Sequence, residues 1–188
     1  AVQTASAGIK YGNIRFRQFS VSDGLPHNQV NTIAQDNDGF IWIGTANGIC
    51  RFDGYSFQRP VFQNDTVPIS NAFIENIYND PEHDRLWIQT DRWFCYYDRK
   101  TERLERVIVN GTHRQGVSFL CTSAGDLLIG TSGGVFRFNA ETDRFENFIE
   151  MPGKRVGRIL EDSGGTLWIK VNTELKRYDV KNGRFVPY

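Results

Sequence analysis

Several common features are absent from this 188-residue sequence, and each absence narrows the possible functions. No charge excess is present, because 22 Lys and Arg balance 22 Asp and Glu, and the basic residues are dispersed among acidic ones. Nucleic-acid-binding proteins usually carry a basic excess or a clustered basic stripe, so that class is disfavoured. No apolar run reaches the length that spans a bilayer, so no membrane span is predicted in this segment.

Cysteine is scarce, and its spacing does not suggest a metal site. Cys50, Cys95 and Cys121 form no CxxC motif and no cluster with histidine at zinc-binding spacing. Cys50 and Cys95 occupy equivalent positions in two repeats described below, where a small buried side chain fits, so free core thiols are expected. We predict no metal site and no cofactor.

Catalytic motifs are also absent. The sequence has no nucleophile elbow, no Ser, His and Asp set with a geometry that could be located, and no acid pair outside the repeat. We therefore predict no catalytic residue, and no enzymatic activity for this segment.

Glycine and aromatic residues are abundant, with 18 Gly, 14 Phe, 7 Tyr and 4 Trp. No segment has a sustained helical period. Short strands rich in aromatic and β-branched residues, joined by glycine-containing turns, are typical of this composition.

One segment repeats four times along the chain. Its anchor is Trp42 in GFIWIGTANGICRFDGYSF, and the same frame returns at Trp87, Leu128 and Trp168, at spacings of 45, 41 and 40 residues. The residue after each anchor is isoleucine, and an aromatic residue lies ten positions after it. Each unit predicts four strands, and four-stranded units with this period are typical of β-propeller blades.

We therefore predict an all-β fold, a β-propeller of about four four-stranded antiparallel blades. The expected blades are residues 21–62, 70–110, 115–150 and 154–188. Residues 14–20 align with the fourth-strand position and are expected to form a leading fourth strand, after a disordered or extended lead-in at residues 1–13.

Counting the leading strand, the sequence predicts about 17 strands, one more than a closed four-bladed ring needs. The segment is therefore expected to be part of a larger propeller. Uncovered apolar faces on its terminal blades predict self-association.

The stretch FSVSDGLPHNQVNTIAQDNDGFIWIGTANGICRFDGYSF resembles the two-component regulator propeller repeat, and the resemblance extends over residues 14–188. Later repeats depart from the pattern: Leu128 replaces the anchor tryptophan, and Trp93 with Phe94 replaces the Asn-Gly turn. The resemblance implies the periplasmic sensor part of an inner-membrane hybrid two-component system of Bacteroidetes. Such a sensor would detect an oligosaccharide and signal to a histidine kinase, and its partners would be that kinase and the remaining propeller.

In propellers, the loops between fourth and first strands and between second and third strands share one face, where ligands commonly bind. Amide, basic and aromatic side chains in these loops suit sugar hydroxyls, uronate carboxylates and pyranose faces. The candidate ligand-binding residues are Trp93, Arg92, His27, Asn28, Asn47, Asn71, His113, Arg114, Lys154 and Arg155. The alternative role for each residue is structural: its side chain would hold its own loop through hydrogen bonds to the backbone. Trp93 is the strongest candidate for ligand contact.

Three classes of function follow from this sequence. We favour a ligand-sensing module that binds an oligosaccharide without turning it over. The alternatives are a protein-interaction scaffold, which would capture a protein, and a glycan-processing propeller enzyme, which would release a product.

Overall fold

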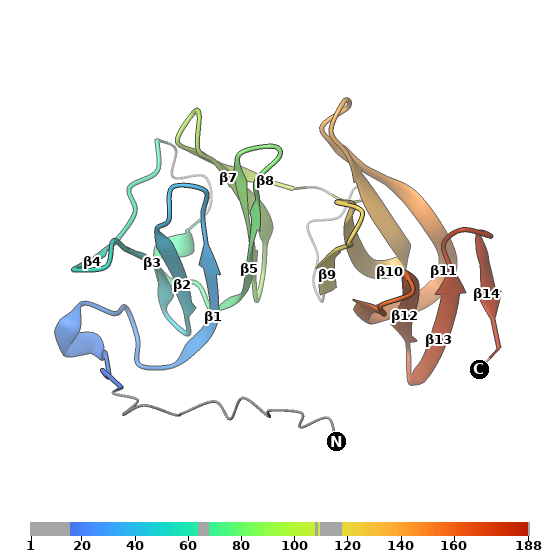
Figure 1. Cartoon of the computed structure of the whole chain (residues 1–188), viewed down its shortest axis with the longest axis horizontal. Helices are drawn as coiled ribbons and strands as arrows, with labels where there is room; N and C mark the ends of the chain where they lie inside the picture. Colours follow the sequence, from blue (N-terminus) through green and yellow to red (C-terminus); the bar gives the residue numbers. More distant parts are fainter. Residues whose placement is uncertain (1–15, 64–67, 108, 110–117, 188) are drawn as a thin grey trace, which may run out of the picture.

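The structure is a computed structural model that describes residues 16–63, 68–107, 109 and 118–187. These residues form fourteen β-strands and two short 3-10 helices, η1 (Val21–Asp23) and η2 (Ile69–Asn71), and all strand pairs are antiparallel (Figure 1). The predicted all-β propeller fold is confirmed.

The first two repeats form two separate four-stranded sheets, in which each strand pairs with the next along the chain. Blade 1 consists of β1 (Val30–Gln35), β2 (Ile41–Thr45), β3 (Gly48–Phe52) and β4 (Phe57–Gln58). Blade 2 consists of β5 (Ile74–Asp80), β6 (Arg85–Thr90), β7 (Phe94–Asp98) and β8 (Arg103–Arg106).

The last two repeats share one continuous six-stranded sheet instead of two separate ones. Its strands are β9 (Ser118–Cys121), β10 (Leu127–Asn139), β11 (Arg144–Glu161), β12 (Thr166–Val171), β13 (Glu174–Asp179) and β14 (Arg184–Val186). We call the part from β9 to the first half of β11 blade 3, and the part from the second half of β11 to β14 blade 4.

This continuity accounts for two of the three strands by which the observed fourteen fall short of the predicted 17, and the absent leading strand accounts for the third. β10 includes both the second and third strands of its repeat, and β11 joins the fourth strand of blade 3 to the first of blade 4. Glycine allows both joins, because Gly134 and Gly153 have φ values of +151° and +69°, and the register of β10 with β11 shifts between Ser132 and Gly134. Ser132 still pairs with Arg155 across the bends.

The leading fourth strand expected at residues 14–20 is absent from the described part of that range, because residues 16–20 form no strand. The third strands of all four blades already have a fourth-strand neighbour, so the position that this segment was predicted to fill is occupied. Instead, the Phe19 ring packs 5.4 Å from the Phe52 ring and 5.2 Å from the Phe57 ring. The expected lead-in at residues 1–13 lies outside the described residues.

The anchor of each of the first three repeats points toward the blade that follows. Trp42 is buried in the cluster between blades 1 and 2, Trp87 in the cluster between blades 2 and 3, and Leu128 in the cluster between blades 3 and 4. The residues beside an anchor point the opposite way, because side chains alternate along a strand. Accordingly, Leu86 and Ile88 belong to the cluster on the blade 1 side of Trp87.

Blades 2 and 3 are joined by a contact between residues from the first and second halves of the chain. The Arg85 guanidinium forms an ion pair with Asp143 at 2.6 Å and lies over the Tyr96 ring, 4.3 Å from its centroid. The Tyr96 hydroxyl donates to the other oxygen of Asp143 at 3.2 Å. The same carboxylate therefore binds two side chains of the neighbouring blade.

Candidate functional site

In each blade where both partners are described, the turn between the second and third strands is bonded to the segment that leads into the first strand. The donor and acceptor pairs are Ala46 N to Gln29 O at 3.0 Å, Asp91 N to Phe73 O at 3.0 Å, and Asn172 N to Arg155 O at 2.8 Å. These two kinds of loop therefore meet at one end of blades 1, 2 and 4, as the propeller topology requires.

The turn of blade 1 also binds the linker to blade 2, beside two of the predicted ligand-binding residues. Gly48 N donates to Ala72 O at 2.7 Å, and Gly48 has a φ of +100°. A Cβ at Gly48 would overlap the carbonyl oxygen of Ser70, so only glycine permits this approach. Asn47 and Asn71, which adjoin the bonded residues, are exposed at this junction.

The predicted residues His27 and Asn28 support the segment before β1. His27 Nδ1 accepts a hydrogen bond from Gln29 N at 2.9 Å, and Asn28 Oδ1 accepts one from Val21 N at 2.9 Å. Both side chains are exposed, but each uses one polar atom to hold the loop.

Arg92 and Trp93 form the turn between β6 and β7. The backbone N–H groups of both residues donate to Thr90 Oγ1, at 3.1 and 2.7 Å. The Arg92 side chain is 76% exposed. By contrast, the Trp93 ring is half-buried against the core between blades 1 and 2, and the Arg106 guanidinium covers one face at 3.9 Å from the ring centroid. That face is closed to a stacking sugar.

The four remaining candidates separate into two groups. His113 and Arg114 lie outside the described residues. Lys154 and Arg155 lie within β11, just after the bend at Gly153. Arg155 N donates to Asn172 Oδ1 at 3.0 Å, which ties β11 to the turn between β12 and β13.

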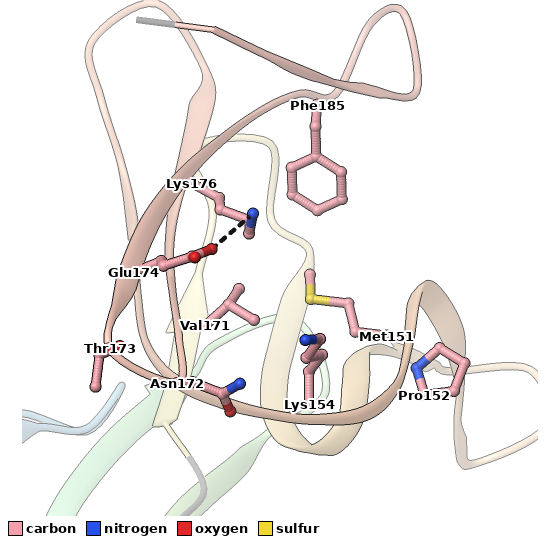
Figure 2. Close-up of a pocket in the computed structure, with 9 residues that line it drawn as sticks. All are labelled: Met151, Pro152, Lys154, Val171, Asn172, Thr173, Glu174, Lys176 and Phe185. Atoms are coloured by element: carbon pink, nitrogen blue, oxygen red, sulfur yellow. Dashed lines mark ion pairs between the residues drawn. The ribbon is translucent and has the colours of Figure 1, made fainter.

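Lys154 lines a pocket of about 420 Å³ at this end of blades 3 and 4 (Figure 2). The pocket is formed by β11, the β12–β13 hairpin and β14. Its lining residues are Met151, Pro152, Lys154, Val171, Asn172, Thr173, Glu174, Lys176 and Phe185.

Three charged side chains share this pocket. Lys176 Nζ lies 3.0 Å from Glu174 Oε2. The hydrogen bond and charge of Lys176, with a smaller effect from the charge of Lys154, hold the pKa of Glu174 below its usual range. Both lysines therefore lie close enough to the Glu174 carboxylate to affect it electrostatically. The pocket lining carries one more positive than negative charge.

The apolar part of the pocket has a buried floor and an exposed wall. Met151 and Val171 are only 7% and 3% exposed and belong to the core between blades 3 and 4. Phe185 is 42% exposed, and the edge of the Tyr178 ring contacts it with a centroid separation of 5.1 Å. The pocket thus combines an apolar surface with ammonium, carboxylate and amide groups.

Of the ten predicted residues, the structure places only Lys154 in this pocket, while the others that it describes are distributed over the loops of blades 1, 2 and 4. The sequence contained a usable signal for two residues that the prediction missed. Glu174 and Lys176 are two positions apart on a predicted strand, and residues at that spacing point to the same face. No such signal was present in the sequence for Phe185, because its position beside the pocket depends on the pairing of β13 with β14.

Within the part of the chain that the structure describes, no three His, Cys, Asp or Glu side chains are grouped as metal ligands. No helix among those residues has the length and apolarity needed to cross a bilayer. All three cysteines are free thiols.

Comparison with known sequences identifies the first repeat. Residues 24–47, which lie in the first repeat, match the family model described as two component regulator propeller. A 46-residue stretch is 41% identical to histidine kinase P4 of Formosa agariphila, and this covers 24% of the chain and 3% of the kinase.

Solved structures share the fold over most of the chain. The extracellular domain of a putative hybrid two component system from B. thetaiotaomicron matches with a TM-score of 0.65 and 22% identity, over 85% of this chain and 22% of that one. A second such domain from the same organism matches with a TM-score of 0.60 and 19% identity, over 90% and 31%. Virginiamycin B lyase from Staphylococcus aureus matches with a TM-score of 0.61 and 15% identity, over 88% and 57%. The chain therefore spans less than a third of these two extracellular domains.

Proposed function

We propose that this chain is a ligand-sensing propeller segment from the extracytoplasmic region of a hybrid two-component sensor, and that it works in the periplasm. The observation that carries the proposal is the match of residues 24–47 to the two component regulator propeller model. The extracellular domains that share its fold over 85% and 90% of its length are consistent with the same role.

The ligand that we propose is an oligosaccharide. The loops at the site end of the blades expose amide and basic side chains, among them Asn47, Asn71 and Arg92. Such groups form directed hydrogen bonds with hydroxyl and carboxylate oxygens. Binding there would be reported to a histidine kinase, the partner that the similarity to histidine kinase P4 suggests.

We further propose that the chain is part of a larger propeller and that it self-associates when studied alone. In blade 4, Leu160 pairs with Trp168 and therefore shares the face to which the anchor points. Leu160 is 52% exposed, whereas Leu128 at the anchor of blade 3 is 1% exposed under the next blade. An apolar face of this kind favours burial against another blade.

An enzymatic role is the second candidate, because virginiamycin B lyase shares the fold. We favour sensing, because residues 24–47 match the two component regulator propeller model. A protein-interaction scaffold is the third candidate and would bind protein instead of sugar.

Calorimetric titration of the 188-residue chain with a panel of plant and host oligosaccharides tests the proposal, with chromatography of each sugar after incubation. A sensor binds at least one oligosaccharide and leaves it intact. Release of a shortened or eliminated product would assign the chain to the enzymes, and failure to bind any member would overturn the proposed ligand class.

A further inference from the structure

We propose that the pocket formed by β11, the β12–β13 hairpin and β14 binds an acidic sugar unit, with its carboxylate between Lys154 and Lys176 and its pyranose ring against Phe185. This inference rests on the proposed sensing of an oligosaccharide and adds the charge of the ligand and the place where it binds. The volume of about 420 Å³ falls within the range of small-molecule sites.

The charges in the pocket favour an anion. Among the described residues, no carboxylate lies within ion-pair distance of Lys154, while Lys176 shares its charge with Glu174. The Lys176 and Glu174 side chains are 42% and 68% exposed, and ion pairs as open as this are weak. A ligand carboxylate can therefore attract both ammonium groups without first breaking a strong internal bond.

Figure 2 shows how the two ammonium groups lie. Lys154 and Lys176 extend from opposite sides of the pocket, from β11 and β13, into the space bordered by Met151 and Phe185. A carboxylate has two oxygens that can each accept hydrogen bonds from an ammonium group. Bonds between an ammonium and a carboxylate are also stronger than bonds between neutral groups, so an acidic sugar gains more here than a neutral one.

The apolar wall favours a ring over a small inorganic ion. Phe185 exposes 42% of its surface, and Tyr178 supports it from the side. One face of a pyranose presents mainly C–H groups, which pack well on an aromatic ring. Met151 and Val171 beneath are buried core residues, so the floor is formed before any ligand arrives.

The hairpin turn adds an amide donor at the rim. Asn172 Oδ1 is used by Arg155 N, which holds the turn against β11. The same amide carries two N–H donors on Nδ2, which are suited to a sugar hydroxyl oxygen. Positively charged, apolar and amide groups therefore converge on one ligand unit.

The test uses two acidic probes, trigalacturonate and a hyaluronan tetrasaccharide, titrated into the isotope-labelled 188-residue chain and followed by amide NMR shifts. The fully methyl-esterified trigalacturonate serves as the neutral counterpart with the same skeleton. We expect at least one acidic probe to shift the amides of residues 172–176 and the esterified probe to leave them unchanged. Added salt should weaken the acidic interaction.

Single substitutions then test which charged side chains contribute to binding. Lys154→Gln and Lys176→Gln should each weaken binding by about three- to tenfold, because each removes one ammonium group. Glu174→Gln should strengthen binding, because it removes the carboxylate that competes for Lys176. Lys170→Gln is the matched control: Lys170 pairs with Leu175, so it lies on the opposite face of the hairpin from Lys176 and should leave binding unchanged.

The inference fails if neither acidic probe shifts residues 172–176, or if the shifts persist unchanged in both lysine variants. If neither acidic probe shifts residues 172–176 but a neutral oligosaccharide binds at other residues, the pocket assignment fails while the proposed sensing stands. If neither the acidic probes nor any neutral oligosaccharide binds, the proposed function fails together with it.

Discussion

The indole Nε1 of Trp42 donates a hydrogen bond to Asp36 Oδ2 at 2.7 Å, and both side chains are buried. The same bond joins Trp87 to Asp80 at 3.1 Å and Trp168 to Asp162 at 2.8 Å. In blade 3, which has Leu128 as its anchor, Thr122 takes the place of the aspartate. The carboxylate is thus present in each blade whose anchor has an N–H to satisfy.

This carboxylate also holds the turn between the first two strands of the blade. Asp36 Oδ1 accepts hydrogen bonds from Asp38 N at 3.0 Å and from Phe40 N at 2.9 Å. One side chain therefore holds both the turn and the anchor ring, so Asp36 in the Asp-Asn-Asp-Gly turn has a structural role.

We predict that Asp36→Ala lowers the free energy of unfolding by roughly 2–4 kcal/mol, because it leaves the buried Trp42 N–H without its acceptor and loosens the turn. Denaturant unfolding followed by tryptophan fluorescence measures the change. The matched control is Asp38→Ala in the same turn, where the side chain is exposed, and it should cost less than about 1 kcal/mol. Equal effects of the two substitutions would show that the buried bond is unimportant.

Acidification should weaken the folded state through the carboxylates of the turns. Hydrogen bonds from the Trp168 side chain and from the Thr166 and Gly164 backbone lower the pKa of Asp162 below its usual 3.8. A carboxyl with a lowered pKa stabilises the fold above about pH 4 and loses that contribution as the pH falls through its folded-state value.

We therefore predict that the free energy of unfolding falls between pH 5 and pH 3, and that Asp162→Asn makes this fall shallower. Denaturant titrations at the two pH values measure the slope. An unchanged slope in Asp162→Asn would mean that other carboxylates account for the acid sensitivity.

The buried thiols should resist modification in the folded chain. Burial raises the pKa of Cys50 to about 11 and that of Cys95 to about 12, so both remain protonated at pH 8. With a chromogenic disulfide reagent at pH 8, we expect Cys121, which is partly exposed, to react first. All three should react rapidly in denaturant, and fast labelling of Cys95 in the native chain would contradict its burial.

The contact between Arg85 and Asp143 should stabilise the junction of blades 2 and 3. Arg85→Met removes the ion pair and the stacking on Tyr96 while keeping much of the apolar stem, and we predict a loss of roughly 1–2 kcal/mol. Arg92→Met, at a side chain that is 76% exposed, is the control and should change stability little. A double-mutant cycle with Asp143→Asn should reveal coupling between the two positions.

Self-association can be tested at the outer face of blade 4. We predict that sedimentation detects oligomers of the chain, and that Leu160→Lys shifts them toward monomer by placing a charge on the exposed apolar face. Val61→Lys, at a residue that is 90% exposed, provides a control outside that face. A monomer at high concentration would exclude the proposed association.

The sequence pattern was sufficient to predict the repeat and the fold class. Strand side chains alternate with a period of two, so an anchor and its aliphatic neighbours point to opposite faces of a blade. Only the structure shows that the anchors of the first three blades face the blade that follows. The loops that carry Asn47 and Asn71 could also be assigned to one end of the blades, because the order of the strands in a propeller brings those turns together.

Other features depended on contacts between segments that are distant in the chain. Trp93 looked like an exposed ligand platform, yet Arg106 from β8 covers one face of its ring. Residues 16–20 matched a fourth strand, but the third strand of every blade already has a fourth-strand neighbour, and Phe19 packs against Phe52 instead. The pocket at Lys154 exists only because strand pairing brings Phe185 and the β12–β13 hairpin together beside β11. The local sequence period specifies the face of the strand on which a side chain lies. Which residues it contacts there is decided by the packing of segments that are distant in the sequence.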